Sequence, residues 1–549
     1  MNKNKFFITT PIYYTNGIPH IGHSYSSIIA DCIARYQKIT GKKVKFSTGV
    51  DENSQKAVLK AEEQGMKIMD YLDMMASKHK AVWDGLGIQY TDFIRTTEDR
   101  HHKFVREVLQ KSYDNGDIYE GVYEGMYCVG CEAFKKDEDL VYLNKTTNKT
   151  FPVSKDIKLT ENIIKVCPDH LTEPQKLKEK NYFFKLSKYQ KYIEELYKNN
   201  PEFVIPNDRF NEVKAFLERG LEDFSISRET NKFGIKLPFD ESQVSYVWYD
   251  ALFNYITVCK TPDNGGNDMD FWPADLHVVG KEIIRFHAIF WPAMLKSAGY
   301  ELPTQILTTG FLTVNGQKIS KSLGNAIDPV EFSQKYSKDL LTLYLLSSFN
   351  IGQDGDFSEL QAILTYNAKL ANNLGNLVNR VVVLSLKLQN EAGKLYGQVD
   401  EFLTEDSLFS IDQDLVGFMK GKPSILDYLE KFQNSINKYD LKSSLDITFS
   451  FLDKLNKFAD IKQPWQMIKD DDKQEETRNV LYTLAEGLRI VGLALYIFFP
   501  VKMDEMFVKL GLLDYKNRLE NGEFEKLLVD FPTFFIKEKG ENLFNRFEI

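Results

Sequence analysis

The strongest constraint on the fold is an alternation of short apolar strands with helices, which occupies the first 115 residues and returns between residues 241 and 355. In the first stretch, an apolar run at Phe6–Ile8 precedes a turn rich in proline and tyrosine. Ser26–Thr40 follows with apolar residues at helical spacing, ends at Gly41, and leads to a strand candidate at Val44–Ser47. Such alternation is typical of βαβ units. The sequence therefore predicts an α/β domain with a Rossmann-like parallel sheet.

The second α/β stretch has strand candidates at Val244–Val247, Leu276–Val279 and Ile306–Thr309 and a helix candidate at Ile283–Ala298. After about Asp356 only helical patterns remain, at Gln361–Leu388, Asp412–Met419, Ser424–Tyr439, Leu441–Asp460 and Glu475–Phe498. We therefore expect five segments: the first half of the α/β domain (1–115), an insertion with clustered cysteines (116–180), the rest of the connecting region (181–240), the second half of the α/β domain (241–355) and an all-α helical bundle (356–549).

Composition excludes several classes of protein. The 549 residues carry a net charge of −9, so any nucleic-acid site must be a local patch on an acidic body. The longest apolar run, near Ile490–Val501, is shorter than the ~18–20 residues that a membrane span needs, and no signal peptide is visible. Five cysteines are too few, and odd in number, for a secreted disulfide scaffold. These features favour a cytoplasmic protein without a membrane partner.

The first motif that could carry chemistry is Pro19-His20-Ile21-Gly22-His23, which follows a strand and opens a helix. Backbone N–H groups at a helix N-terminus favour anions, and two histidines can donate to phosphate oxygens. Gly22 allows another group to approach the backbone closely. The same residues also fit an ordinary strand-to-helix turn whose histidines cap the helix.

The second motif is Lys318-Ile319-Ser320-Lys321-Ser322, just after a tight-turn signal at Asn315-Gly316. Two lysines and two serines on one loop suit phosphoryl oxygens and could neutralise the charge of a departing pyrophosphate. The alternative is a solvated lysine loop with no ligand.

The third motif consists of two pairs of residues that could bind a metal ion. Cys128 and Cys131 are separated by two residues, and Cys167 with His170 follows after 35 intervening residues. Three thiolates and one imidazole match a closed, structural zinc site. A set of buried thiols is the alternative.

Aromatic residues follow two of the predicted strands: Trp248 and Tyr255 after one, His287 and Trp291 after another. At strand ends of an α/β sheet they could line a small apolar pocket, which would suit a thioether, or they could form a plain core cluster. In the helical segment, Asn376 and Arg380 share one helix face, and with Trp465 they offer the amide, guanidinium and ring that unpaired RNA bases need. A helix face plus a core tryptophan explains those three residues equally well.

Taken together, the motifs resemble the class I aminoacyl-tRNA synthetases and, within them, the methionyl-tRNA synthetase family. The resemblance runs from about Phe6 to about Pro500. The two metal-ligand pairs match the zinc insertion of that family in its form with a single Cys3His knuckle. The most specific matches are Thr10–Tyr14, His20–His23, Val247–Ala251, Val279–Glu282, Thr309–Leu312 and Lys318–Ser322.

The resemblance implies a methionine–tRNA ligase that activates L-methionine with ATP as methionyl-adenylate and transfers the methionyl group to initiator and elongator tRNA(Met), releasing AMP and pyrophosphate. It implies one structural Zn²⁺ per chain and Mg²⁺ with the ATP. The implied sites are as follows: catalysis at His20, His23, Lys318 and Lys321; ATP at Gly22, Gly280, Glu282, Ser320, Lys321 and Ser322; methionine at Ile12, Tyr14, Asp51, Trp248, Tyr255, His287 and Trp291; zinc at Cys128, Cys131, Cys167 and His170; the CAU anticodon at Asn376, Arg380 and Trp465.

Some residues depart from the family pattern. The common Asp-Glu-His-Gly segment here ends in Asn53-Ser54, Ile319 stands where Met is usual, Leu252 replaces a proline, and Glu282 stands where Asp is frequent. No appended tRNA-binding, dimer-forming domain is visible after the helical segment, so a monomer is expected.

Other proteins share the two phosphate motifs. Leucine, isoleucine and valine enzymes carry a large editing domain between them, and the 295 positions from His23 to Lys318 are too few for it. A cysteine enzyme would hold its zinc in the active site. A non-catalytic tRNA-binding paralogue would be expected to have lost His20, His23 or Lys321, and smaller nucleotidyltransferases with the H-I-G-H motif lack the helical domain.

Overall fold

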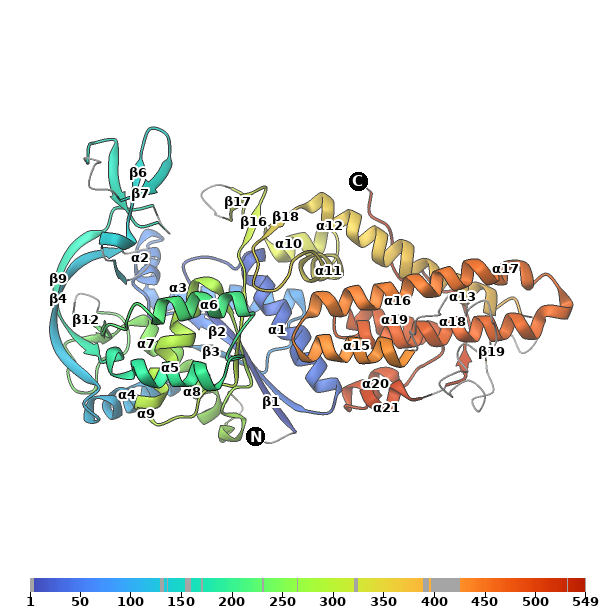
Figure 1. The fold of residues 1–549 in the computed structure, drawn as a ribbon, viewed down its shortest axis with the longest axis horizontal. Helices are drawn as coiled ribbons and strands as arrows, with labels where there is room; N and C mark the ends of the chain where they lie inside the picture. Colours follow the sequence, from blue (N-terminus) through green and yellow to red (C-terminus); the bar gives the residue numbers. More distant parts are fainter. Residues whose placement is uncertain are drawn as a thin grey trace.

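The structure, a computed structural model, describes residues 4–128, 133–135, 137–153, 159–168, 171–229, 232–263, 265–319, 324–388, 394–395, 425–530 and 532–548. Its centre is a six-stranded sheet in the order β10-β15-β14-β1-β2-β3 (Figure 1). Every neighbouring pair is parallel, which confirms the predicted α/β fold. The strands are β1 (Lys5–Tyr14), β2 (Lys43–Asp51), β3 (Asp92–Arg95), β10 (Val204–Ile205), β14 (Leu276–Gly280) and β15 (Gln305–Thr309).

Helices connect these strands and cover the sheet. The long helix α1 joins β1 to β2, and α2 and α3 join β2 to β3 (Figure 1). Parallel strands need such crossovers, because a tight turn cannot return the chain to the same end of the sheet. The helices of this part are α1 (Ile21–Ile39), α2 (Gln55–Glu63), α3 (Ile68–Leu86), α4 (Asp99–Asp114), α7 (Val247–Leu252), α8 (Asn254–Lys260) and α9 (Trp291–Ala298).

The structure corrects three of the predicted elements. Strand β1 continues to Tyr14 through Pro11, because a register shift between Thr9 and Ile12 accommodates a residue that cannot donate to the ladder. The strand predicted at 244–247 is only β13 (Val244–Ser245), which pairs antiparallel with β12 (Ser227–Arg228) outside the main sheet. The helix predicted at 283–298 consists of a 3₁₀ turn, a π-helical segment at Phe286–Phe290 and then α9.

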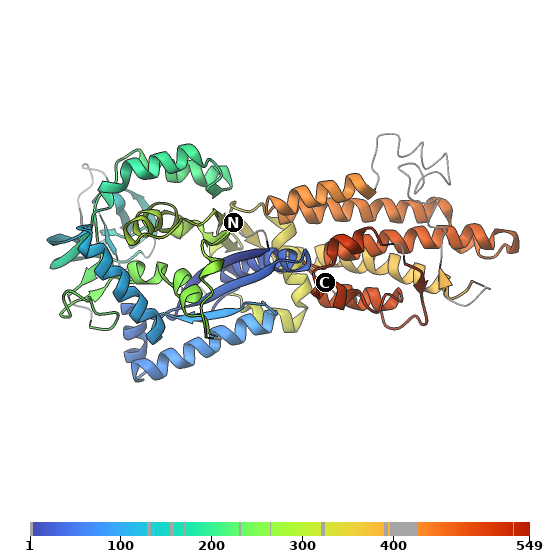
Figure 2. The ribbon, with the colours of Figure 1, turned by 90° about the horizontal axis from the view of Figure 1, so that it is seen from below.

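A β-rich arm is inserted between α4 and α5, at the opposite end of the molecule from the C-terminal helices (Figures 1 and 2). Its spine is a long antiparallel pair, β4 (Ile118–Cys128) and β9 (Gln175–Phe184). This pair belongs to a four-stranded sheet in the order β11-β9-β4-β5, and a second, three-stranded sheet has the order β7-β6-β8. Their other strands are β5 (Ala133–Lys135), β6 (Val141–Asn144), β7 (Lys149–Pro152), β8 (Ile163–Val166) and β11 (Phe224–Ser225), and helices α5 (Gln190–Asn199) and α6 (Asn207–Leu217) return the chain to the main sheet.

The chain leaves β15 through a short three-stranded sheet and two helices before the C-terminal bundle begins. These elements are β16 (Leu312–Val314), β17 (Gln317–Lys318), α10 (Pro329–Lys335), α11 (Lys338–Ser348) and β18 (Gly355–Phe357). The tight turn predicted at Asn315-Gly316 is present between β16 and β17, with both residues at positive φ.

The C-terminal part is helical, as predicted, apart from the two-residue strands β19 (Lys394–Leu395) and β20 (Phe534–Phe535). The long helix expected over 361–388 contains a π-helical segment at Asn367–Gly375, and the helix expected at Asp412–Met419 lies outside the described residues. The helices are α12 (Glu359–Tyr366), α13 (Asn376–Ser385), α15 (Ile425–Asn437), α16 (Leu441–Lys462), α17 (Pro464–Met467), α18 (Gln474–Leu495), α19 (Pro500–Lys509), α20 (Tyr515–Glu520) and α21 (Phe524–Leu528).

Helix α1 links the sheet to the C-terminal helices. One continuous apolar cluster includes residues of β1, α1, α11, α16 and α18. Near the end of α1, the buried Arg35 pairs with Asp31 and donates to the carbonyl oxygen of Ile497, and Tyr36 packs edge-on against Phe524 at 6.1 Å between ring centroids. The two parts of the molecule therefore share one core. Among the described helices, none is long and apolar enough to cross a membrane.

Candidate active site

The predicted site residues gather at the carboxyl ends of the central strands. Strand β1 pairs with β2 on one side and with β14 on the other, so the order of the sheet reverses between them. The ends of parallel strands at such a switch point leave a crevice that commonly holds ligands. Tyr14, Asp51, Gly280 and Thr309 are the last residues of β1, β2, β14 and β15, respectively. The crevice therefore lies beside the start of α1.

His20 and His23 cap the beginning of α1. The Nδ1 atom of His20 accepts from the backbone N–H of Gly22 at 3.1 Å, and the Nδ1 atom of His23 accepts from the backbone N–H of His20 at 3.1 Å. The ring centroids are 4.0 Å apart. Because each Nδ1 is an acceptor, the proton of each neutral ring is on Nε2. The capping alternative raised by the sequence is thus correct in geometry, and both Nδ1 atoms face the backbone at the start of α1.

Gly22 leaves room for the ring of His20 and lies near Ile319 of the second motif. A Cβ at Gly22 would lie 2.9 Å from Cε1 of His20 and 3.7 Å from Cδ1 of Ile319. The backbone N–H of Ile21 also donates to the carbonyl oxygen of Ile327 at 3.2 Å. The structure therefore brings the histidine motif against the segments that flank the lysine loop. The backbone of Lys318 ends β17, whereas Ser320, Lys321 and Ser322 lie outside the described residues.

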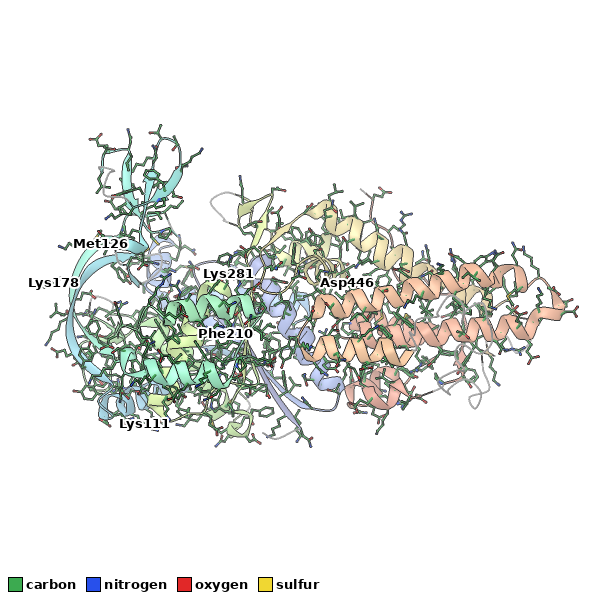
Figure 3. The ribbon with its side chains drawn as sticks, viewed as in Figure 1. Lys111, Met126, Lys178, Phe210, Lys281 and Asp446 are labelled. Carbon is green, nitrogen blue, oxygen red and sulfur yellow. The ribbon has the colours of Figure 1, made fainter. Side chains whose placement is uncertain are left out.

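Gly280 and Glu282 form the opposite edge of the crevice. A Cβ at Gly280 would lie 2.4 Å from Oε2 of Glu282, so the carboxylate lies close over the end of β14, where glycine has no side chain. Burial, with a smaller contribution from Glu282, raises the pKa of Tyr13 to about 12. The neighbouring Lys281, labelled in Figure 3, pairs with Asp354 at 2.6 Å. Glu282 therefore places a negative charge at the ends of β14 and β1.

A cluster of buried rings lies behind this edge. The hydroxyl of Tyr255 is 2.8 Å from Nε2 of His287, and Nδ1 of His287 is 3.0 Å from the carbonyl oxygen of Ile283. A carbonyl oxygen can only accept, so Nδ1 carries the proton and Nε2 accepts from Tyr255. Burial lowers the pKa of His287 to about 4 and raises that of Tyr255. Both groups are therefore neutral at pH 7.

Trp291 completes the cluster through a residue that the sequence analysis missed, His277. The indole N–H of Trp291 donates to Nε2 of His277 at 3.3 Å, and Tyr255 and Trp291 lie 6.0 Å apart between ring centroids. The π-helical segment at Phe286–Phe290 brings His287 and Trp291, four residues apart, into this one cluster. His277 sits inside an apolar strand, and only its polar character within that run could have marked it.

Ile12, Tyr14 and Trp248 occupy the rim rather than the buried cluster. Trp248 is half-buried and stacks on Phe286, with 4.0 Å between ring centroids and an interplanar angle of 4°. Ile12 is half-buried on β1, and Lys56 lies over the ring of Tyr14 at 4.3 Å. The predicted pocket residues thus form an inner group of neutral rings and an outer, more open group.

Asp51 is buried at the end of β2, in register with Tyr14. The next residues explain how the departure from the family pattern is accommodated. The amide nitrogen of Asn53 donates to the carbonyl oxygen of Thr96 at 3.0 Å. The hydroxyl of Ser54 caps α2 by accepting from the N–H of Ala57 at 3.2 Å. Both substitutions therefore have defined structural partners next to Asp51.

The predicted zinc ligands are only partly described. Cys128 ends β4 and Cys167 follows β8; both are buried and neither is in a disulfide. Cys131 and His170 lie outside the described residues. Within the part of the chain that the structure describes, no group of three or more potential metal ligands is present. Two buried thiols fit half of a closed Cys3His set.

The helical part brings two of the three predicted anticodon residues together. The guanidinium of Arg380 lies over the ring of Trp465 at 5.5 Å and pairs with Asp460 at 3.2 Å. Asn376 and Arg380 are exposed and four residues apart at the start and middle of α13. Arg380 and Trp465 thus form one stacked surface unit, although they come from helices far apart in the sequence.

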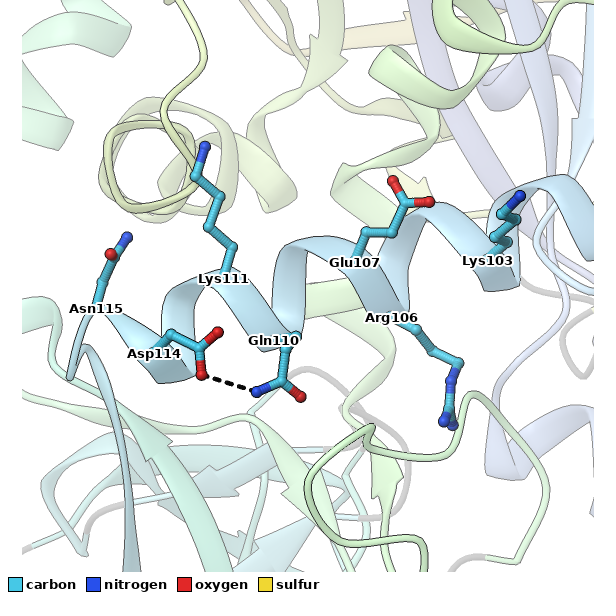
Figure 4. A pocket seen from close by; sticks show the side chains of 7 residues that line it. All are labelled: Lys103, Arg106, Glu107, Gln110, Lys111, Asp114 and Asn115. Atoms are coloured by element: carbon cyan, nitrogen blue, oxygen red, sulfur yellow. Dashed lines mark hydrogen bonds between the residues drawn. The ribbon is translucent and has the colours of Figure 1, made fainter.

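Two surface hollows are separate from this crevice. One runs along α4, where Lys103, Glu107 and Lys111 are among the lining residues (Figure 4). The other lies where the end of α1 meets α20. No residue predicted for the site lines either hollow.

Comparisons with known proteins agree with the fold. The family described as tRNA synthetases class I (M) matches residues 6–382. The methionine–tRNA ligase of Clostridium tetani is 40% identical over 506 residues, which is 91% of this chain and 72% of that protein. The methionine–tRNA ligase of Bacillus subtilis is 36% identical over 554 residues, covering 100% of this chain and 78% of that protein.

A solved structure of similar fold is the Mycobacterium tuberculosis methionyl-tRNA synthetase in complex with methionyl-adenylate. It superposes with a TM-score of 0.86 at 31% identity, over 99% of this chain and 100% of that one. The family match, the curated relatives and the solved structure all point to one family. The chain belongs to the methionyl-tRNA synthetases, a family of class I aminoacyl-tRNA synthetases.

Proposed function

We propose that the strand-end crevice binds ATP at the start of α1 and methionine against the buried rings. The reaction is that of a methionine–tRNA ligase: methionine is activated with ATP, and the methionyl group is transferred to tRNA. The observation that carries the site assignment is the adjacency of the two motifs, since a Cβ at Gly22 would lie 3.7 Å from Cδ1 of Ile319 and both histidines cap the same helix end.

In the first step, a methionine carboxylate oxygen attacks the α-phosphorus, and the bond to the bridging oxygen of pyrophosphate breaks. His20 and His23 donate through Nε2–H to phosphate oxygens, where negative charge grows in the transition state. Lys318 and Lys321, with Ser320 and Ser322, close over the phosphates from the other side. Mg²⁺ bound with ATP would neutralise part of the phosphate charge, as is general for nucleotide-using enzymes.

The amino acid is held by charge at one end and by rings at the other. The Asp51 carboxylate receives the ammonium group, and Glu282 with Gly280 borders the nucleotide. Tyr255, His287 and Trp291 enclose the thioether, which packs favourably against aromatic rings. Trp248, Ile12 and Tyr14 form the outer wall. Because the inner groups are neutral at pH 7, the pocket offers an apolar, uncharged environment to the side chain.

The tRNA partner engages the distant helical part. In our proposal Trp465 and Arg380 stack on and bond to unpaired bases of the CAU anticodon, and Asn376 bonds to a base edge. The same three contacts would serve initiator and elongator tRNA(Met), which share that anticodon. In the second step, the terminal ribose hydroxyl of tRNA attacks the carbonyl carbon of the adenylate, and AMP leaves.

We also propose that Cys128, Cys131, Cys167 and His170 hold one structural zinc ion. Two of the four are buried thiols in the arm, and the donor set is one that binds zinc with no open position for substrate. When bound, zinc would stabilise the arm and take no part in the reaction.

The decisive experiment is ATP–pyrophosphate exchange with a panel of amino acids. Exchange that depends on methionine alone supports both the ATP site and the pocket. Exchange with cysteine or a branched aliphatic amino acid would contradict the pocket while retaining the ATP site. No exchange with any amino acid would contradict both and favour an RNA-binding role.

A further inference from the structure

We infer that His277 is a positioning residue of the methionine pocket, which orients Trp291 through a hydrogen bond and supports the ring of Tyr255. The inference rests on the proposed function, because it assumes that Trp291 and Tyr255 contact the methionine side chain. His277 lies in the middle of β14, directly opposite Thr9 of β1 in the parallel register, and its side chain is fully buried. It is thus built into the two central strands of the sheet.

The hydrogen bonds of His277 have only one consistent direction. The indole nitrogen of Trp291 can only donate, so Nε2 of His277 accepts from it at 3.3 Å. The proton of the neutral imidazole is therefore on Nδ1, which donates to the hydroxyl oxygen of Thr9 at 2.7 Å. A chain of donors runs from Trp291 through His277 to Thr9, and it ties a pocket wall to the rigid sheet.

The same ring also packs against the second pocket wall. The centroids of His277 and Tyr255 are 4.3 Å apart, and the rings are tilted by 33°. On its other side, Tyr255 donates to His287. The single side chain of His277 thus touches two of the three inner rings and is one ring away from the third, at 6.1 Å between the centroids of His277 and His287.

Burial in this ring cluster keeps the pKa of His277 well below its usual value, with a smaller contribution from His287. The Nε2 atom therefore remains an acceptor over the working pH range. Other side chains that could accept from an indole N–H, such as a carboxylate, would place a buried charge against the thioether. A neutral histidine is suited to hold Trp291 without adding charge.

The test compares two substitutions, one of which retains a polar group near Nδ1 and the other a polar group near Nε2. His277→Asn retains a polar group near the Nδ1 position and removes the acceptor of Trp291. His277→Gln places an amide oxygen near the Nε2 position and retains that acceptor. We expect the asparagine variant to raise the KM for methionine about tenfold in ATP–pyrophosphate exchange, the scale of one lost buried hydrogen bond, with kcat and the KM for ATP unchanged. The glutamine variant should recover most of the affinity.

A matched control is His101→Gln. His101 is also fully buried and also bonds a threonine, since its Nδ1 is 2.9 Å from the hydroxyl of Thr257. It lies on α4 and makes no described contact with Trp291. This variant should leave the KM for methionine unchanged, whereas a general loss of core packing would affect both histidine variants alike.

A second readout is ¹⁹F NMR of protein labelled with 5-fluorotryptophan. The chain has five tryptophans, and Trp291→Phe identifies the signal of Trp291. That signal should shift in His277→Asn, return toward its original position in His277→Gln, and remain in place in His101→Gln.

The results for Trp291→Phe and His277→Asn distinguish a failure of the pocket assignment from a failure of the role of His277. If Trp291→Phe leaves the KM for methionine unchanged, the pocket assignment fails. If Trp291→Phe raises that KM but His277→Asn does not, the pocket stands and the role of His277 is overturned. Equal loss of kcat in the asparagine and glutamine variants, with the KM for methionine unaltered, would also overturn it.

Discussion

The hydroxyl of Tyr255 and the Nε2 atom of His287 are joined by a 2.8 Å hydrogen bond in which the tyrosine is the donor. The tautomer follows from the bond between Nδ1 of His287 and the carbonyl oxygen of Ile283. Two polar groups that could have faced the substrate as unmatched donors or acceptors thus satisfy each other. The Tyr255 hydroxyl and the His287 ring are therefore hydrogen-bonded within the ring cluster and carry no charge.

Tyr255→Phe should weaken methionine binding. The variant keeps the ring but leaves Nε2 of His287 buried without its donor, so we expect the KM for methionine to rise about tenfold with kcat less affected. Tyr249→Phe is the control, because Tyr249 is equally buried and its hydroxyl bonds Ser112 away from the pocket. Steady-state exchange kinetics measure both variants, and equal effects would argue against a specific role for Tyr255.

Gly22→Ala should slow adenylate formation. The new Cβ would lie 2.9 Å from Cε1 of His20, and this ring must then move away from the phosphates. We expect kcat for exchange to fall by about a hundredfold to a thousandfold, the range typical for one lost transition-state donor. Gly85→Ala on α3 is a matched helical glycine whose new methyl group meets only the side chain of Val330. Unchanged kcat in Gly22→Ala would contradict the role of His20.

Buried histidines should make the fold sensitive to acid. Burial lowers the pKa of His101 to about 3, below the ~6.5 of an unfolded chain. Between these values only the unfolded state binds the proton, so the free energy of unfolding falls as the pH falls. We expect a contribution of about 1.4 kcal/mol per pH unit between pH 6 and 4. Urea unfolding across this range should show a shallower pH dependence in His101→Gln, and an unchanged slope would refute the assignment.

Arg380→Ala should impair tRNA charging and spare the first step. The substitution removes the cation stacked on Trp465 and its donors, so we expect the KM for tRNA in aminoacylation to rise at least tenfold while ATP–pyrophosphate exchange is unchanged. Lys469→Ala removes one exposed positive charge near Trp465 without touching the stack. If both variants lose the same affinity, bulk charge rather than base recognition explains the effect.

Cys128→Ser should lower the zinc content of the purified protein. A hydroxyl is a much poorer zinc ligand than a thiolate, so we expect metal analysis to show well under one zinc per chain. Cys259→Ala serves as the control, since Cys259 is buried between α8 and the main sheet and should leave the zinc content unchanged. An unaltered zinc content in Cys128→Ser would exclude it as a ligand.

Local patterns predicted the parallel sheet and the helical C-terminal part, because each depends on spacing within one segment. They placed the start of the first helix at Ser26, whereas α1 begins at Ile21. They could not predict β13 as an antiparallel strand outside the sheet, since two-residue pairing depends on where Ser227–Arg228 lies in space. The length of β1 was also underestimated, because a bulge that accommodates Pro11 is set by the neighbouring strand.

At the site, the two phosphate motifs were recognisable because their residues are contiguous. Their contact through Gly22 and Ile319 is tertiary and had to be seen in the structure. His277 was missed for the same reason: its partners, Thr9 and Trp291, are on two other elements. Arg380 and Trp465 were proposed as separate candidates from residue type alone, and their contact is seen only in the structure.

Helix α1 has His20 and His23 at one end and the C-terminal helices at the other, about 28 Å away at 1.5 Å per residue. Its length is therefore fixed at both ends. Inserting a single residue between His23 and Asp31 would turn one end relative to the other by about 100° and lengthen the helix by about 1.5 Å. Either His20 and His23 would move away from the strand ends, or Arg35 would lose its hydrogen bond to the carbonyl oxygen of Ile497. The number of residues in this helix is thus under stronger constraint than the identity of most of them, and insertions or deletions there should be tolerated far less than substitutions.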